Sequence, residues 1–224
     1  MTEAARSTEP ARSAEPAGSI QPAGRSEPAV RRGEPRDALA VAELVHESAA
    51  AVLERFGGER DGSIRVLRAA YGRPGNTVSR EIVWVAERDG AAAGAMTAFP
   101  AAELERRARR FLRILLVRTP PWTWRESIRL HRLGAELVPP PPAESLYVDS
   151  LATAPRERRR GAARALLAEA EREARRLRLP ALALETALDN APARALYEAA
   201  GFEAVAERAP RAGLPGFAGY VKPL

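Results

Sequence analysis

The segment from residue 151 to residue 163 reads Leu151-Ala152-Thr153-Ala154-Pro155-Arg156-Glu157-Arg158-Arg159-Arg160-Gly161-Ala162-Ala163. A strand-like run here passes through a basic turn into a predicted helix. The free backbone N–H groups at a helix start, together with the helix dipole, form a site for an anion, and a small residue such as Gly161 lets a pyrophosphate approach closely. From the residues alone, the turn is either such a site or a solvated surface turn.

The segments on either side of this turn complete a strand, helix and strand unit. Residues 145–153 are strand-like, 161–179 carry leucine and alanine at helical spacing, and 181–186 are strand-like again. Two strands of one sheet joined by a crossover helix run parallel with a right-handed connection. Downstream, the pattern predicts a short helix at 192–200 and closing strands at 202–206 and 216–221.

Upstream of the turn, the pattern alternates between helix and strand. Residues 29–32 are extended, and an amphipathic helix over 38–56 is ended by Gly57-Gly58. A shorter helix is predicted near 63–71. The predicted strands 82–87 and 93–99 flank Asp89-Gly90, a strong turn signal, and therefore form a hairpin. The order of elements predicts an α/β or α+β fold with a mixed sheet.

Residues 101–142 interrupt the strands with a predicted helical insertion. Pro120-Pro121 ends its first helix. Thr123 followed by Glu126 has the spacing of a capping box that could start the second helix, and Pro139–Pro142 ends it.

The insertion is also basic, because residues 101–138 contain nine arginines and four glutamates, a net charge of +5. Such a charge could attract an acidic acceptor or a membrane surface, and the alternative is that the two helices simply cover the sheet with their apolar face. Trp122 and Trp124 are predicted to form either a lid or plain core.

Composition narrows the class of protein. The 224 residues suit one domain at 29–224, preceded by a tail at 1–28 whose repeated serine, glutamate and proline phrases predict disorder. With no cysteine and two histidines, a metal site is not expected. The absence of a signal peptide or a long apolar run predicts a cytoplasmic protein without a transmembrane segment. Of the 35 basic residues, 34 are arginine, a bias typical of a GC-rich coding sequence. The net charge of +6 is therefore weak evidence for nucleic-acid binding.

Two motifs resemble the GNAT family of N-acetyltransferases. Arg158-x-x-Gly161-x-Ala163 matches the family's Arg/Gln-x-x-Gly-x-Gly/Ala signature, and residues 190–202 resemble its Asn-x-x-Ala-x-x-Leu-Tyr-Glu-x-x-Gly-Phe segment. The resemblance covers 145–203 closely and 29–99 more weakly. It implies a mixed, mostly antiparallel sheet whose central parallel strands splay apart, flanked by helices.

The resemblance also implies that acetyl-CoA binds as the acyl donor. The backbone of Leu151 and Thr153 would pair with the pantetheine arm, the amides of 159–163 would hold the pyrophosphate, and Asn190 would contact the cofactor further along. One departure is Ala163, which replaces the commoner second glycine. The cofactor-binding positions expected in this way are Leu151, Ala152, Thr153, Arg158, Arg159, Arg160, Gly161, Ala162, Ala163, Arg164 and Asn190.

Acetyl transfer needs a neutral amine, an acceptor for its proton and a donor for the departing thiolate. At the family's tyrosine position, Tyr197 is the expected donor, and the alternative is a tyrosine of the core. Glu185 matches a glutamate that acts as base in some relatives. Asp149 competes for that role, and either carboxylate could act through water.

The resemblance therefore implies transfer of acetyl to a primary amine of a small molecule, a protein N-terminus or a lysine. A non-catalytic module that binds acyl-CoA as a sensor is the alternative, and nucleic-acid binding through the insertion is a third. Because relatives often pair through terminal strands or helices, the possibility of a homodimer is left open.

Overall fold

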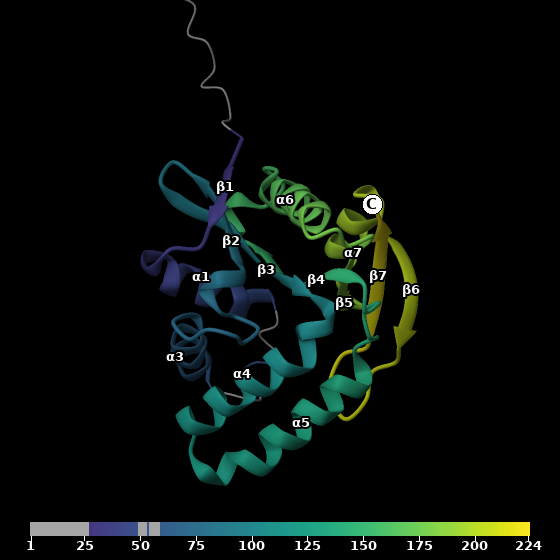
Figure 1. Ribbon diagram of the computed structural model, residues 1–224. Coiled ribbons are helices and arrows are strands. Elements are labelled where there is room, and N and C mark those ends of the chain that lie inside the picture. Colours follow the sequence, from purple (N-terminus) through teal and green to yellow (C-terminus); the bar gives the residue numbers. More distant parts are fainter. Residues whose placement is uncertain (1–26, 49–52, 54–58) are drawn as a thin grey trace, which may run out of the picture.

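A seven-stranded sheet in the order β1-β2-β3-β4-β5-β7-β6 organises the protein (Figure 1). The computed structural model describes residues 27–48, 53 and 59–224. All neighbouring strands are antiparallel except β4 and β5, which run parallel. The strands are β1 (Ala29–Arg32), β2 (Val83–Arg88), β3 (Ala91–Pro100), β4 (Ser145–Thr153), β5 (Ala181–Ala187), β6 (Glu203–Arg208) and β7 (Phe217–Pro223). The mixed, mostly antiparallel sheet is thus confirmed.

Helices cover both faces of this sheet (Figure 1). One face packs against α6 and α7 through a core that includes Leu146, Leu166 and Leu182. The opposite face packs against α1 and α3 through residues such as Val45, Leu67 and Val85. The α-helices are α1 (Ala38–Ser48), α3 (Arg60–Tyr71), α4 (Leu104–Arg118), α5 (Trp124–Leu137), α6 (Ala162–Arg176) and α7 (Ala191–Ala199).

The parallel strands β4 and β5 part after four residue pairs. Their pairing runs from Ser145 opposite Ala181 to Val148 opposite Leu184 and then stops, although both strands continue. The pairing of β3 with β4 is irregular at the same level, because Thr97 faces Ser150 while Ala98 faces Val148. The extra residue, Asp149, is a β-bulge, which bends a strand. The bulge accounts for the splaying of β4 from β5.

Residues 101–142 form the two predicted helices, α4 and α5, which run along the lower end of the molecule in Figure 1. α4 packs against α3. Three leucines of α5 pack with Leu214, in the loop before β7, and with Phe217, the first residue of β7. The insertion therefore contacts its neighbours along one end of the sheet.

The capping box predicted at Thr123 is wrong, and of the two alternatives for Trp122, a lid or core, the core is excluded. Thr123 has helical dihedral angles, and its hydroxyl donates to the Pro120 carbonyl oxygen instead of capping α5. The physical reason is Pro121, which starts a 3-10 turn that leads directly into α5. Trp122 is 83% exposed and Trp124 is 39% exposed, so Trp122 lies outside the core.

Two predictions fall partly outside the described residues. The tail at 1–28 is described only for residues 27 and 28. The helix predicted over 38–56 is described as α1 from Ala38 to Ser48, and of residues 49–56 only Leu53 is described. Across the described ranges, no helix has the length and apolar character needed to span a bilayer. The same ranges bring together no group of three or more potential metal ligands.

Candidate active site

The turn between β4 and α6 has the backbone geometry of an anion site. Gly161 precedes the helix with a φ of 91°, a left-handed conformation that glycine adopts readily, and Arg159 has a φ of 58°. The first backbone bond of the helix runs from the Ala165 N–H to the Gly161 carbonyl oxygen. Within the described structure, the N–H groups of residues 159–164 have no acceptor assigned. This leaves a run of donors at the positive end of the helix dipole.

Arg88, at the end of β2, stabilises this turn through hydrogen bonds to two of its residues. Its Nη1 donates to Oε2 of Glu157 at 2.5 Å, and its Nη2 donates to the Arg160 carbonyl oxygen at 2.7 Å. Arg160 Nη1 in turn donates to Oε1 of Glu157 at 2.9 Å. The Arg88 side chain is only 5% exposed, so these charge-assisted bonds are sheltered from solvent. Arg88 thereby fixes the backbone of the turn.

The arginines of the turn differ in their surroundings. Arg158, Arg159, Arg160 and Arg164 are all exposed. The Arg158 guanidinium pairs with Glu47 of α1 at 2.8 Å, while the structure gives Arg159 and Arg164 no carboxylate partner among the described residues. Ala162, the first residue of α6, is buried in the core, and Ala163 is partly exposed. The methyl group of Ala163 therefore lies in the first turn of α6 and leaves the N-terminus of this helix accessible.

The gap between β4 and β5 gives the expected pantetheine strand an unpaired edge. Leu151, Ala152 and Thr153 pair on one side with Met96, Ala95 and Gly94 of β3. On the other side, the pairing with β5 has already ended at Val148. The β4 backbone beyond Val148 therefore has no strand partner facing β5, and the gap leads directly to the turn at 155–161. An extended ligand can add to such an edge as a further strand would.

The candidate catalytic side chains approach this gap from opposite faces of the sheet. Tyr147 and Ala183 pack on the face of Phe99, and Glu185 follows Ala183 by two residues, which places its side chain on that same face. Tyr197 of α7 packs on the other face, with Val148 and Leu184. The gap therefore lies between a carboxylate on one face and a phenol on the other.

Two carboxyl groups and a tyrosine interact beside the gap, because the charge of Asp149 acts on both Tyr147 and Glu185. The Tyr147 hydroxyl donates to Oε2 of Glu185 at 2.5 Å. Desolvation and, secondarily, the charge of Asp149 raise the pKa of Glu185 to about 8, even though the Tyr147 hydrogen bond opposes the shift. Desolvation raises the pKa of Asp149 to about 7. Both carboxyl groups therefore titrate near neutrality, the range in which a group exchanges protons most effectively.

Tyr197 lies in an aromatic cluster, with Phe202 at 6.0 Å and Tyr220 at 5.7 Å between ring centroids. Desolvation, followed by the charge of Glu185, raises the pKa of the Tyr197 phenol well above its ordinary value. The phenol therefore remains protonated at neutral pH. No hydrogen bond is assigned to its hydroxyl within the described structure. Tyr197 is both part of the core and a protonated group beside the gap, so the two readings of this residue are compatible.

Asn190 has a structural role that the sequence analysis did not anticipate. Its Oδ1 accepts a hydrogen bond of 3.3 Å from the Ala193 N–H and so caps the start of α7. Its Nδ2 donates to Thr186 Oγ1 of β5 at 3.1 Å. Asn190 therefore ties α7, which carries Tyr197, to the strand that carries Glu185.

Sequence reasoning missed two residues of this site. Tyr147 lies two positions before Asp149 on a predicted strand. On a regular strand this spacing places both side chains on one face, so the sequence does contain a signal for Tyr147. Arg88 carried no such signal, because its partner Glu157 is 69 residues away in the chain.

The site thus lies where the one parallel strand pair of a mixed sheet splays beside a glycine-containing turn at a helix start. The family model described as Acetyltransferase (GNAT) family matches residues 65–202, more than half of the chain. The protein belongs to the GNAT acetyltransferase family.

Solved structures agree with this assignment at the level of the fold. An N-acetyltransferase from Staphylococcus aureus Mu50 is 19% identical with a TM-score of 0.66, and 86% of this chain and 99% of that chain are covered. Another solved acetyltransferase is 21% identical with a TM-score of 0.61, covering 87% of this chain and 98% of that one. A chain of the NatC complex bound to Gag peptide and CoA is 16% identical with a TM-score of 0.50, covering 89% and 99%. No curated protein matches the sequence.

Proposed function

We propose that the protein is an N-acetyltransferase that moves an acetyl group from acetyl-CoA to a primary amine. The observation that carries the proposal is the gap between β4 and β5, which joins the donor-rich turn at 155–161 to the protonated Tyr197 and the carboxyl groups of Glu185 and Asp149. Membership of the GNAT family supports the reaction type. In this proposal residues 29–224 form one catalytic domain, 101–142 are an insertion, and 1–28 are an extension.

The pyrophosphate of acetyl-CoA binds to the N–H groups of residues 159–164, with positive charge from Arg158, Arg159, Arg160 and Arg164 around it. The pantetheine arm pairs with the free edge of β4 at Leu151 and Thr153, and Ala152 holds that edge in the sheet. Asn190 contacts the cofactor from the start of α7. The acetyl thioester then lies in the gap, because the strand edge leads there from the turn.

The amine attacks the thioester carbonyl carbon from the face that carries Glu185. The new C–N bond forms as the amine loses a proton, which passes to the Glu185 carboxylate directly or through water, with Asp149 as the alternative acceptor. Collapse of the tetrahedral intermediate breaks the C–S bond. The phenol of Tyr197 donates its proton to the departing thiolate, and the products are the acetylated amine and CoA. Proton return from Glu185 to Tyr197 through solvent restores the starting state.

Calorimetric titration of acetyl-CoA into the purified protein tests the cofactor site, with two matched variants. Gly161→Asp places a negative charge where the pyrophosphate would lie. In the variant Gly161→Asn, the asparagine side chain has nearly the same size as aspartate and tolerates a left-handed φ equally well, but it is uncharged. We expect binding by the wild type, near-complete loss in Gly161→Asp and a much smaller loss in Gly161→Asn. A folded wild type that does not bind acetyl-CoA contradicts the proposal.

Turnover is measured as CoA thiol released in the presence of a panel of primary amines. The chain contains no cysteine, so a thiol-specific dye reports only the product. Amine-dependent release supports the transferase. Binding without release across small amines, N-terminal peptides and lysine peptides instead supports a non-catalytic acyl-CoA sensor.

A further inference from the structure

The connection between α4 and α5 exposes an unusual amount of apolar surface. Val117 is 76% exposed, Trp122 is 83% exposed and Trp124 is 39% exposed, all within residues 117–125. We call this segment the hairpin apex. In Figure 1 it is the turn between α4 and α5, at the end of the molecule opposite β1. Exposed apolar groups gathered at one projecting point commonly mark a binding surface.

The hairpin apex is held in a fixed conformation by its own hydrogen bonds. The Trp124 indole Nε1 donates to the Thr119 carbonyl oxygen at 3.2 Å, and the Thr119 hydroxyl donates to the Leu115 carbonyl oxygen at 3.0 Å. The Thr123 N–H and hydroxyl both donate to the Pro120 carbonyl oxygen, at 3.0 and 2.8 Å. The exposed indoles are thus presented on an ordered turn, which lowers the entropy lost on binding.

Arginines surround the hairpin apex with little compensating charge. Residues 113–132 contain five arginines and one glutamate, a net charge of +4. Of these arginines, Arg129 pairs with Glu126 at 2.6 Å. The others have no carboxylate partner among the described residues: Arg113, Arg118, Arg125 and Arg132.

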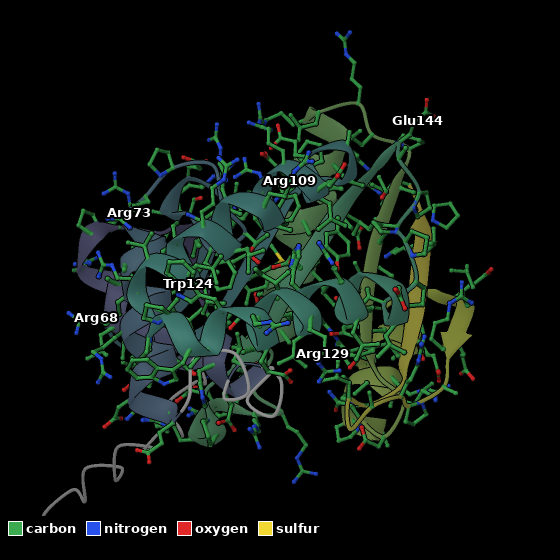
Figure 2. All side chains as sticks on the ribbon, turned by 90° about the horizontal axis from the view of Figure 1, so that it is seen from below. Arg68, Arg73, Arg109, Trp124, Arg129 and Glu144 are labelled. Carbon is green, nitrogen blue, oxygen red and sulfur yellow. The ribbon has the colours of Figure 1, made fainter. Side chains whose placement is uncertain are left out.

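The positive charge extends beyond the hairpin on the same side of the molecule. Figure 2 shows α4 and α5 from below, with Trp124, Arg109 and Arg129 on them and Arg68 and Arg73 at one edge. Arg68 and Arg73 are exposed, lie at the end of α3 and in the turn after it, and likewise have no carboxylate partner in the described part of the chain.

From these observations we infer that the hairpin apex docks on an anionic lipid membrane, with Trp122 and Trp124 in the headgroup region and Arg118 and Arg125 against the lipid phosphates. Tryptophan partitions to membrane interfaces because its ring is apolar and its N–H is polar. Arginines near an anionic leaflet add electrostatic attraction. A nucleic acid fits less well, because the apex is a projecting turn with an exposed aliphatic residue, Val117, where a single strand needs a groove with stacking rings.

Vesicle flotation of the full chain tests the inference. We expect the protein to float with vesicles of phosphatidylcholine and phosphatidylglycerol, to bind vesicles of pure phosphatidylcholine at least about tenfold more weakly, and to be released by high salt. Binding should also shift tryptophan emission to shorter wavelength, because two of the three tryptophans enter the interface while Trp84 is already buried.

The variants separate the apex from general surface effects. Trp122→Ser should weaken binding to the mixed vesicles about tenfold, and Arg118→Gln with Arg125→Gln should remove most of the dependence on anionic lipid. Val205→Ser is the matched control, because Val205 is 60% exposed on the edge strand β6. Equal binding by Trp122→Ser and wild type overturns the inference. So does absence of binding to the mixed vesicles, and tight binding to single-stranded DNA in that case identifies a nucleic-acid surface instead.

Discussion

The Tyr147 hydroxyl of β4, one residue before the last strand pair, donates a 2.5 Å hydrogen bond to the carboxylate of Glu185, the first residue of β5 beyond that pair. This bond links the two strands across the end of their backbone pairing. It also fixes the orientation of the carboxylate and favours its charged form, against the desolvation that raises the pKa of Glu185 to about 8. Tyr147 is thus a positioning residue in the proposed reaction.

Replacement of Glu185 by glutamine should lower the rate with a reactive amine by about 10²-fold or more, because the proton acceptor is lost. The acetyl-CoA dissociation constant should change by less than about twofold, since the cofactor turn is untouched. Steady-state kinetics and calorimetry measure the two effects. Asp149→Asn is the comparison variant, and if it carries the loss while Glu185→Gln does not, Asp149 is the base.

Replacement of Tyr147 by phenylalanine should move the pH dependence of kcat/KM. In the wild type, the Tyr147 hydrogen bond favours the ionised form of Glu185. Without this bond, the pKa of Glu185 should rise further, and the rising limb of the pH profile should shift to higher pH by roughly 0.5 to 1 unit. The same amine is used for both proteins, so ionisation of the acceptor is common to both profiles. An unshifted limb with normal turnover would show that the Tyr147 bond is only structural.

The two carboxyl groups should make the protein less stable as pH rises. The pKa values of Asp149 and Glu185 are about 7 and about 8 in the folded state, above those of the unfolded chain. The folded state therefore binds more protons, and this contribution to stability is present at low pH and is lost as pH rises from about 4 to about 8, with a slope of at most about 1.4 kcal/mol per pH unit for each proton.

Urea unfolding at pH 5, 7 and 9 measures this effect. The variant Glu185→Gln should gain stability relative to wild type as pH increases, and Asp149→Asn should do the same. Glu105→Gln, on the exposed face of α4, should run parallel to wild type. Parallel behaviour of all four proteins would show that ionisation of Asp149 and Glu185 is not linked to folding.

Replacement of Arg88 by glutamine should cost about 3 kcal/mol of folding stability, because Glu157 loses its sheltered partner and the Arg160 carbonyl loses a donor. Acetyl-CoA should also bind about fivefold more weakly, since the turn is no longer preorganised. Chemical unfolding and calorimetry provide the two values.

Arg172→Gln is the matched control for Arg88. Arg172 pairs with Glu169 on the surface of α6 and is 62% exposed, so its loss should cost less than about 0.5 kcal/mol. If both substitutions have the same small effect, Arg88 does not hold the turn.

Local signals predicted most of the fold. The helical spacing after Gly161, the Asp89-Gly90 turn and the strand pattern of 145–153 each specify their element from a short window, and the structure has those elements within a few residues. The sequence predicts the start of α5 at the right place but for the wrong reason, because a 3-10 turn that begins at a proline and a threonine cap give similar helix boundaries.

Long-range geometry was not predictable in the same way. The bulge at Asp149 depends on the register between β3 and β4, which no window of sequence contains. The Arg88 contact with Glu157 depends on the packing of the hairpin under the turn. The sequence could therefore nominate Glu185 and Tyr197, while their placement on opposite faces of one gap required the assembled sheet.

Tyr197 and Tyr220 lie 5.7 Å apart between ring centroids but should respond oppositely to loss of the hydroxyl. The Tyr220 hydroxyl accepts a bond from Arg194 Nε at 3.0 Å and donates to Oε1 of Glu198 at 3.3 Å, so Tyr220→Phe should lose roughly 1 kcal/mol of stability and retain turnover. No bond is assigned to the Tyr197 hydroxyl within the described residues, so Tyr197→Phe should keep its stability.

Turnover should separate the two variants in the other direction. If the Tyr197 phenol protonates the leaving thiolate, Tyr197→Phe should lower kcat by about 10²-fold while acetyl-CoA binds normally, because the ring remains in place. The loss should shrink for thioesters with a more acidic thiol, whose thiolate departs without a proton. A Tyr197→Phe enzyme with full activity on CoA thioesters would assign the residue to the core alone and leave solvent as the proton donor.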